Sequence, residues 1–222
     1  MQNPKYPKTI YLIRHGLTGG NERGEWLGAK SVHELNEYGG KQARDTADTL
    51  KKINVDASKI YSSPTERALQ HAEILQRHLQ LSIEKINSIT EINLGILEDR
   101  SRKEGLKLVP EEVAKWENNL REFSPPLGES AVEAAERFYE TVELIACNAQ
   151  KQDLVFVSHG VVIKLFLARI LCASIETGEA KIDVPWTRHG SITVVTCNEQ
   201  GFKFKKVIEN KYPDSDEVAA LG

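Results

Sequence analysis

Two short apolar segments, each followed by a polar residue, a histidine and a glycine, constrain the fold of this 222-residue chain more than any other feature. They are Thr9–Ile13, followed by Arg14–Gly16, and Leu154–Val157, followed by Ser158–Gly160. Apolar, β-branched runs of this length are typical of buried strands. Because strand-like runs alternate with amphipathic helical stretches, we predict an α/β fold of three layers, in which helices flank a mostly parallel central sheet.

The two histidines are expected at the same edge of this sheet. His15 and His159 each come directly after a predicted strand. Ligands of α/β folds bind outside the carboxyl ends of the parallel strands. The sequence therefore predicts a ligand site that includes both histidines.

Two helix starts carry capping signals. Asn36 is suited to cap a helix with an apolar stripe between residues 43 and 50. The spacing of Ser63–Glu66 predicts a second helix with a capping box and with proline at its first position. Arg67 then lies in the first turn, where backbone N–H groups already favour an anion.

The second half of the chain is expected to contain an insertion, a long helix and a closing hairpin. Residues 99–128 are rich in charge and are interpreted as a small helical insertion or a lid over the site. An apolar stripe from Val132 to Ile145 predicts a long amphipathic helix. Residues 192–207 suit an antiparallel hairpin, and the tail from Pro213 is expected to be loosely held.

Length and composition restrict the class of protein. At 222 residues the chain is expected to form one domain, residues 1–222. The net charge of −3 gives no broad attraction to nucleic acid or to an anionic membrane. Three isolated cysteines and an N-terminus without a secretory apolar stretch favour a cytoplasmic location. The longest apolar run, residues 161–173, is too short to span a bilayer and predicts a core helix.

The side chains around the two His-Gly pairs fit phosphoryl transfer. Such chemistry needs a nucleophile, donors for the three equatorial oxygens and an acid for the leaving oxygen. A histidine with its ordinary pKa of about 6.5 offers a neutral nitrogen near neutral pH, which makes His15 and His159 candidate nucleophiles. Arg14 and Arg67 are candidate donors, because the planar guanidinium matches phosphate bidentately and stays charged.

Several ordered motifs resemble the histidine phosphatase superfamily, which also contains the cofactor-dependent phosphoglycerate mutases and the fructose-2,6-bisphosphatases. The segments that carry the resemblance are Leu12–Gly16 with Thr18 and Asn21, Leu35–Gly39 with Gln42 and Ala43, Tyr61–Ser63 with Arg67, Ala68 and Gln70–Glu73, Glu91–Gly95, Gly128–Ser130, Val157–Gly160 and Gly190–Ile192. A single R-H-G tripeptide would be a weak indication, whereas this ordered set is specific.

The resemblance implies a role for each site residue. His15 is then the phosphorylated nucleophile, and Glu91 is the proton donor. The residues around the transferred phosphoryl group are Arg14, Arg67 and His159, and those at the rim are Thr18, Asn21 and the backbone N–H groups that begin at Gly160. The resemblance implies neither a metal nor a cofactor.

The chain departs from the family's pattern at two positions. Leu17 stands where Glu or Gln is frequent, and Asp99 stands where a glycine commonly follows the Glu91 loop. Both positions are expected at the rim of the pocket, so they affect substrate choice. The charged insertion is interpreted as a solvated helix or as a lid that carries Arg100, Arg102 or Arg121 to a second acidic group of the substrate.

Four further histidines allow two interpretations each. His33 and His189 are surface residues or part of the pocket mouth. His71 and His78 lie seven residues apart on one predicted helix, a spacing that favours an exposed face over a metal pair.

These observations predict a metal-independent phosphomonoester hydrolase that acts through a phosphohistidine on His15, with a small phosphorylated metabolite as substrate. Mutase-type transfer is the main alternative, although the 67 residues between Glu91 and His159 leave little room for the longer covering segment of the mutases. A catalytically silent sensor of phosphorylated ligands also remains open, as does a metal-dependent hydrolase with His15 and His159 as ligands. The sequence indicates no oligomeric state.

Overall fold

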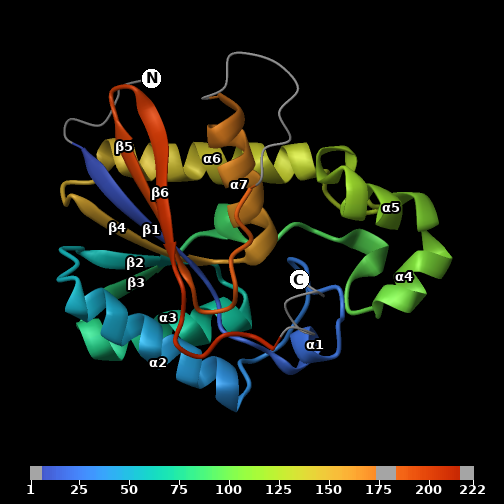
Figure 1. Cartoon of the computed structure of the whole chain (residues 1–222), viewed down its shortest axis with the longest axis horizontal. Coiled ribbons are helices and arrows are strands. Elements are labelled where there is room, and N and C mark those ends of the chain that lie inside the picture. The colour runs from blue at the N-terminus through green and yellow to red at the C-terminus, as the bar shows by residue number, and fades with distance from the viewer. Residues whose placement is uncertain (1–6, 174–183, 216–222) are drawn as a thin grey trace.

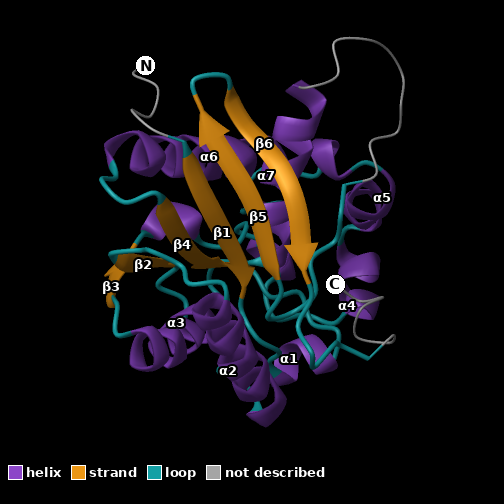
Figure 2. Cartoon of the chain, turned by 60° about the vertical axis from the view of Figure 1, so that its left-hand side comes forward, coloured by secondary structure: helices purple, strands orange, loops and turns teal. Residues whose placement is uncertain are grey.

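The computed structural model describes residues 7–173 and 184–215, which form a six-stranded sheet with helices on both faces (Figures 1 and 2). The strands are β1 (Lys8–Arg14), β2 (Lys59–Ser62), β3 (Ser82–Lys85), β4 (Asp153–Ser158), β5 (Ile192–Asn198) and β6 (Gly201–Ile208). The helices are α1 (Gly19–Glu22), α2 (Glu37–Lys52), α3 (Glu66–Leu79), α4 (Arg102–Leu108), α5 (Pro110–Asn118), α6 (Ala131–Asn148) and α7 (Gly160–Ala173). Short 3-10 turns occupy Asn87–Ile89, Gly95–Leu97 and Leu120–Glu122.

The strand order of the sheet is β3-β2-β4-β1-β5-β6. The first four strands in this order run parallel, β5 is antiparallel to β1, and β6 is antiparallel to β5. The predicted α/β fold with a mostly parallel sheet is therefore confirmed, as is the closing hairpin. The register pairs Arg14 of β1 with Ser158 of β4, so His15 and His159 leave the sheet at the same edge.

Strand β1 contributes alternate residues to two separate cores. Ile10 and Leu12 belong to the core beneath α6 and α7, whereas Tyr11 and Ile13 belong to the core beneath α2 and α3. Successive side chains of a strand point to opposite faces, so β1 is packed from both sides. This packing on both faces fixes the position of the residues at the carboxyl end of β1.

Helix α3 begins two residues later than predicted. Its first residue is Glu66 and its N-cap is Thr65, with no hydrogen bond from a capping side chain. The predicted start at Pro64 and the capping box are wrong, because the Ser63 hydroxyl lies 2.8 Å from His159 Nε2 and serves the site instead. Arg67 still lies in the first turn, as expected.

Helix α6 has the predicted extent, and Phe138 and Val142 of the predicted stripe are buried. Its buried positions are Ala131, Ala134, Phe138, Val142 and Ala146. Val132, which was expected at the start of the stripe, is 47% exposed. The four-residue spacing from Phe138 onward sets the inward face, and Val132 falls outside it.

Residues 99–128 form α4, α5 and a 3-10 turn to one side of the sheet (Figure 1). Val113 and Phe123 are buried in the same core as Trp26, so the segment is packed against the molecule. Asp99 has a φ of 60°, a conformation that glycine adopts most easily, which explains why glycine suits this position. The interpretation of the segment as a lid stays a prediction.

The chain after β6 is docked up to Ser215. Asp214 is only 4% exposed, and the Tyr38 hydroxyl donates to the Pro213 carbonyl. The expectation of a loose tail is wrong for residues 213–215, because Asp214 has buried partners; residues 216–222 lie outside the described part. In the described ranges, Cys147 and Cys197 are free thiols, and no helix is long and apolar enough to cross a membrane.

Candidate active site

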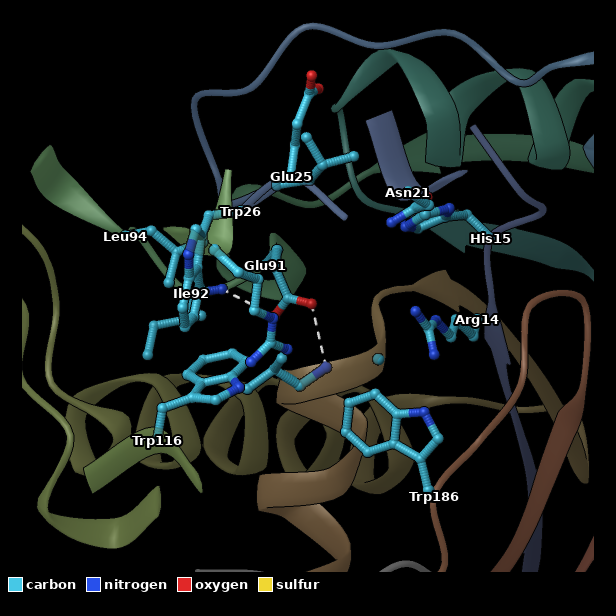
Figure 3. Close-up of a pocket in the computed structure, with 14 residues that line it drawn as sticks. Arg14, His15, Asn21, Glu25, Trp26, Glu91, Ile92, Leu94, Trp116 and Trp186 are labelled. Atoms are coloured by element: carbon cyan, nitrogen blue, oxygen red, sulfur yellow. Dashed lines mark hydrogen bonds between the residues drawn. The ribbon is translucent and has the colours of Figure 1, made fainter. Parts of the chain in front are cut away.

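A pocket lies beyond the carboxyl ends of β1 and β4 (Figure 3). Its lining consists of Arg14, His15, Asn21, Glu25, Trp26, Leu27, Glu91, Ile92, Leu94, Arg102, Trp116, Gly160, Val161 and Trp186. Arg67 and His159 are fully buried beside His15 and stand behind this lining. The pocket therefore lies at the edge of the sheet where the sequence predicted a ligand site.

His15 is held in one tautomer. Its Nδ1 lies 2.8 Å from the Gly16 carbonyl, which can only accept, so Nδ1 carries the proton. Its Nε2 accepts a hydrogen bond of 3.1 Å from Arg67 Nε and therefore presents a lone pair. Burial and the Arg67 cation hold the pKa of His15 well below the usual 6.5, so the ring is neutral.

Arg67 is surrounded by backbone carbonyls. Its two terminal nitrogens donate to Ser31 O at 3.0 Å and Gly28 O at 2.9 Å. The Glu98 carboxylate fastens the same loop by accepting from the Gly28 N–H and the Ser31 hydroxyl. Burial lowers the pKa of Arg67 to about 10, which leaves it a cation near neutral pH.

Arg14 precedes His15 at the end of β1 and lines the pocket. It donates from Nη1 to the Thr187 carbonyl at 2.8 Å and from Nη2 to His189 Nε2 at 2.9 Å. Its buried Nε has no partner among the described residues. A Cβ on Gly160 would come within 2.9 Å of that nitrogen, so only glycine leaves room for the guanidinium.

His189 is buried and oriented by a carboxylate. Since an arginine can only donate, His189 Nε2 accepts, and Nδ1 carries the proton that it donates to Asp214 at 2.9 Å. Burial and Arg14 lower the pKa of His189 to about 4. Burial raises the pKa of Asp214, but the hydrogen bond from His189 outweighs that effect and lowers the pKa to about 2.

His159 faces His15 from the end of β4. The centroids of the two rings lie 5.1 Å apart, and His159 Nε2 is 2.8 Å from the Ser63 hydroxyl. Burial and the Arg67 cation lower the pKa of His159 well below 6.5. Its Nδ1 is buried and has no partner in the described part of the chain.

Glu91 lies at the N-terminus of α7, and one of its two dashed lines in Figure 3 is a hydrogen bond with that helix. Its carboxylate accepts from the N–H groups of Val161 at 3.0 Å and Val162 at 3.2 Å. Burial nevertheless raises the pKa of Glu91, against the effect of its backbone hydrogen bonds. Arg137 fixes this loop by donating to the carbonyl of Glu91.

Together these groups form a buried cationic site around a neutral imidazole. Arg67 is bonded to the imidazole of His15, Arg14 lines the pocket with it, and a carboxyl group with a raised pKa lines the same pocket. Such an arrangement can bind a tetrahedral anion, offer it a nitrogen lone pair and supply a proton to a group that leaves it.

Comparison with known proteins identifies the family. A sequence profile described as the histidine phosphatase superfamily (branch 1) matches residues 10–210. The chain belongs to this superfamily.

Curated relatives within the superfamily differ in their described activities. A probable phosphoglycerate mutase, GpmB, of Proteus mirabilis is 30% identical in an alignment 171 residues long that covers 73% of this chain and 74% of the relative. A probable phosphatase of Schizosaccharomyces pombe is 28% identical and covers 92% of this chain and 70% of its own length. The 6-phosphofructo-2-kinase/fructose-2,6-bisphosphatase 3 of Bos taurus is 30% identical, but the match takes up only 35% of its length.

A solved structure of the same fold is Bacillus stearothermophilus YhfR. It superimposes with a TM-score of 0.80 and 24% sequence identity, and the match covers 94% of this chain and 98% of YhfR. This likeness confirms the fold predicted for a histidine phosphatase.

Of the residues predicted at the rim of the pocket, some line the pocket and others do not. Asn21 and Gly160 line the pocket. Thr18 is fully buried; its hydroxyl caps α1 by accepting from the Asn21 N–H and donates to the Asn21 side chain. The N–H groups of Val161 and Val162, expected as rim donors, bond to Glu91. Roles in binding substrate stay predictions for all of them.

Two histidine interpretations are wrong. His71 is fully buried rather than on an exposed face, and its Nδ1 accepts from the Gly16 N–H at 3.0 Å, whereas His78 is exposed as expected. His189 does not lie at the surface, because Arg14 and Asp214 enclose it. His33 lies outside the pocket lining, with its Nε2 3.0 Å from Asp99.

The structure also locates the two positions that depart from the family's pattern and the arginines of the insertion. Neither Leu17 nor Asp99 belongs to the pocket lining. Of the three arginines proposed for the insertion, Arg102 lines the pocket, while Arg100 and Arg121 are exposed.

Sequence reasoning missed four supporting residues of the site: Ser63, Glu98, Arg137 and Asp214. Glu98 follows the Glu91 motif closely enough to have been suspected, whereas Asp214 carries no local signal. Within residues 7–173 and 184–215, no group of three or more His, Cys, Asp or Glu side chains is arranged to hold a metal ion.

Proposed function

We propose that the chain is a metal-independent phosphomonoester hydrolase that acts on a small phosphorylated metabolite through a phosphohistidine on His15. The observation that carries this proposal is the state of His15: a neutral ring whose Nδ1–H is held by the Gly16 carbonyl and whose Nε2 lone pair faces Arg67. A nucleophilic histidine needs this tautomer, because only the unprotonated nitrogen can attack phosphorus.

In the first step His15 Nε2 attacks phosphorus, and the bond between phosphorus and the leaving oxygen breaks. Glu91 in its acid form, which its raised pKa favours, gives its proton to that oxygen, so the alcohol leaves neutral. Arg67 Nε transfers its hydrogen bond from His15 to a phosphoryl oxygen, and Arg14 and the free nitrogen of His159 donate to the others.

In the second step water attacks the phosphohistidine and the bond between nitrogen and phosphorus breaks. The Glu91 carboxylate takes the proton from that water, which restores its acid form. His15 returns to its neutral tautomer and inorganic phosphate leaves. The carboxyl group thus acts first as acid and then as base.

Mutase-type transfer is the second candidate, since one curated relative is described as a probable phosphoglycerate mutase. A mutase must keep water away from its phosphohistidine. The 67 residues between Glu91 and His159 leave little room for the longer covering segment of the mutases, which favours hydrolysis.

The test is hydrolysis of p-nitrophenyl phosphate in EDTA by the wild-type chain, His15→Ala and His78→Ala, whose exposed side chain makes it a matched control. We expect turnover in wild type and His78→Ala and none in His15→Ala. Inhibition by EDTA would favour the metal-dependent alternative. Absence of turnover would contradict hydrolysis, and phosphoglycerates would then test the mutase.

A further inference from the structure

We propose that Asp214 and His189 are positioning residues that set the orientation of Arg14 in the active site. The inference rests on the proposed function only in that Arg14 must have a phosphoryl group to bind. It concerns His189, which lies 175 positions from Arg14 in the sequence and is hydrogen-bonded to it, and Asp214, which is hydrogen-bonded to His189.

A chain of hydrogen bonds runs from Asp214 through His189 to Arg14. Asp214 Oδ2 accepts from His189 Nδ1 at 2.9 Å and from the His189 backbone N–H at 3.1 Å. This double contact fixes both the ring orientation and the tautomer. His189 Nε2 is then an acceptor aimed at Arg14 Nη2, 2.9 Å away.

Two acceptors restrict rotation of the Arg14 guanidinium. Its Nη1 is bonded to the Thr187 carbonyl, and Nη2 is bonded to His189. Two acceptors define the plane of a guanidinium, whereas one alone lets it rotate about that bond. With both present, Nε stays unpaired inside the site, available to an anion.

The Asp214 carboxylate also holds the segment that follows His15 in the sequence. Asp214 Oδ1 accepts from Gln42 Nε2 at 3.1 Å, and Gln42 Oε1 accepts from the Leu17 N–H at 2.8 Å. Asp214 is thus linked to residues on both sides of His15 in the sequence. All of these side chains are buried, so water does not replace a lost partner.

A matched pair of variants tests the role of Asp214. Asp214→Asn keeps the shape but cannot accept from both His189 and Gln42. Asp45→Asn is the control, because Asp45 binds the same tail through the Lys211 N–H and ammonium without touching His189. We expect Asp214→Asn to lose roughly 10- to 100-fold in kcat/KM and in affinity for orthovanadate, and Asp45→Asn less than about threefold.

Equal losses in the two variants would mean that only docking of the tail matters and would overturn the proposal. So would an Asp214→Asn variant with wild-type kcat/KM and vanadate affinity.

Substitutions of His189 separate positioning from packing. His189→Gln keeps an acceptor for Arg14, whereas His189→Phe fills the same space without one. We expect His189→Gln to retain at least tenfold more activity than His189→Phe at equal thermal stability. If the two variants are equally active, the acceptor has no role.

A double-mutant cycle tests whether the effect passes through Arg14. In an Arg14→Lys background, Asp214→Asn should cost less than about threefold further, because no guanidinium is left to orient. An undiminished loss would contradict the proposal. If the wild-type chain hydrolyses nothing but binds vanadate, the proposed function fails while the vanadate affinities still decide the present inference. If it does neither, both fail.

Discussion

The acid role proposed for Glu91 depends on a carboxyl group whose pKa is raised by burial. The N–H groups of Val161 and Ile92 act on this pKa in the opposite direction. The acid form is needed when the leaving oxygen departs, so the active fraction falls as the pH rises through this raised pKa.

Glu91→Gln should therefore affect substrates unequally. We expect a loss of roughly 10²- to 10⁴-fold on alkyl phosphates, whose leaving groups need a proton, and a much smaller loss on p-nitrophenyl phosphate. The alkaline fall of the wild-type pH–rate profile should also disappear in this variant. Equal losses on both substrates would remove Glu91 from the acid role.

Arg67 should not be replaceable by lysine. The arginine bonds His15 and two loop carbonyls through separate nitrogens, and a single ammonium cannot reproduce that fork. We expect Arg67→Lys to lower kcat/KM on the order of 10²-fold. Arg77→Lys, exposed on the same helix, is the control and should behave as wild type. Activity of Arg67→Lys close to wild type would show that charge alone suffices.

At the scale of elements, the loop that surrounds Arg67 depends on one carboxylate. Glu98 accepts from the N–H groups of Gly28, Lys30 and Leu94 and from the Ser31 hydroxyl. A Cβ on Gly28 would lie 2.3 Å from a Glu98 oxygen, so the two segments meet without spare room. Glu98 thus fixes the position of Arg67 indirectly, through this loop.

Replacing Glu98 with Gln should loosen this loop, because an amide offers one acceptor oxygen where the carboxylate offers two. We expect a loss of about 1–3 kcal/mol in the free energy of unfolding and faster hydrogen exchange at Gly28 and Lys30. Glu104→Gln, in the exposed capping box of α4, should leave exchange at these amides unchanged. Unchanged exchange in Glu98→Gln would contradict the role given to Glu98.

The elements that the sequence predicted best were those with local signals. The strand before His15 and the hairpin at residues 192–207 follow from apolar patterning alone, and the site residues His15, His159 and Arg67 follow from their places at element ends. The start of α3 was misjudged because Ser63 turns its hydroxyl to His159 rather than to the helix. The role of Asp214 could not be predicted from the sequence, because its partners Gln42 and His189 come from distant parts of the chain.

At the scale of the whole molecule, several neutral histidines make the fold sensitive to acid. Burial lowers the pKa of His71 to about 3 and that of His189 to about 4, and it lowers those of His15 and His159 well below 6.5. The unfolded chain therefore binds more protons than the folded chain below about pH 6.5, so stability falls as the pH falls. Glu91, with its raised pKa, acts in the opposite direction.

His71→Thr should reduce this sensitivity. Between pH 6.5 and about 3, one such histidine contributes up to about 1.4 kcal/mol of unfolding free energy per pH unit. Urea denaturation across pH 4–6.5 should give a shallower slope for His71→Thr than for wild type. His78→Thr, exposed on the same helix, should keep the wild-type slope. Identical slopes for all three proteins would mean that His71 is protonated in the folded state.

The sheet order has a consequence for how the protein is made. β1 is central, yet its two neighbours, β4 and β5, begin at Asp153 and Ile192. At roughly 5–20 residues per second, β1 leaves the ribosome on the order of ten seconds before β4 does. During that interval its apolar residues 10–13 have no pairing strand, and such unpaired edges promote aggregation. The segment that ends in His15 is thus synthesised well before the strands that pair with it, and it stays exposed to wrong pairing until they appear.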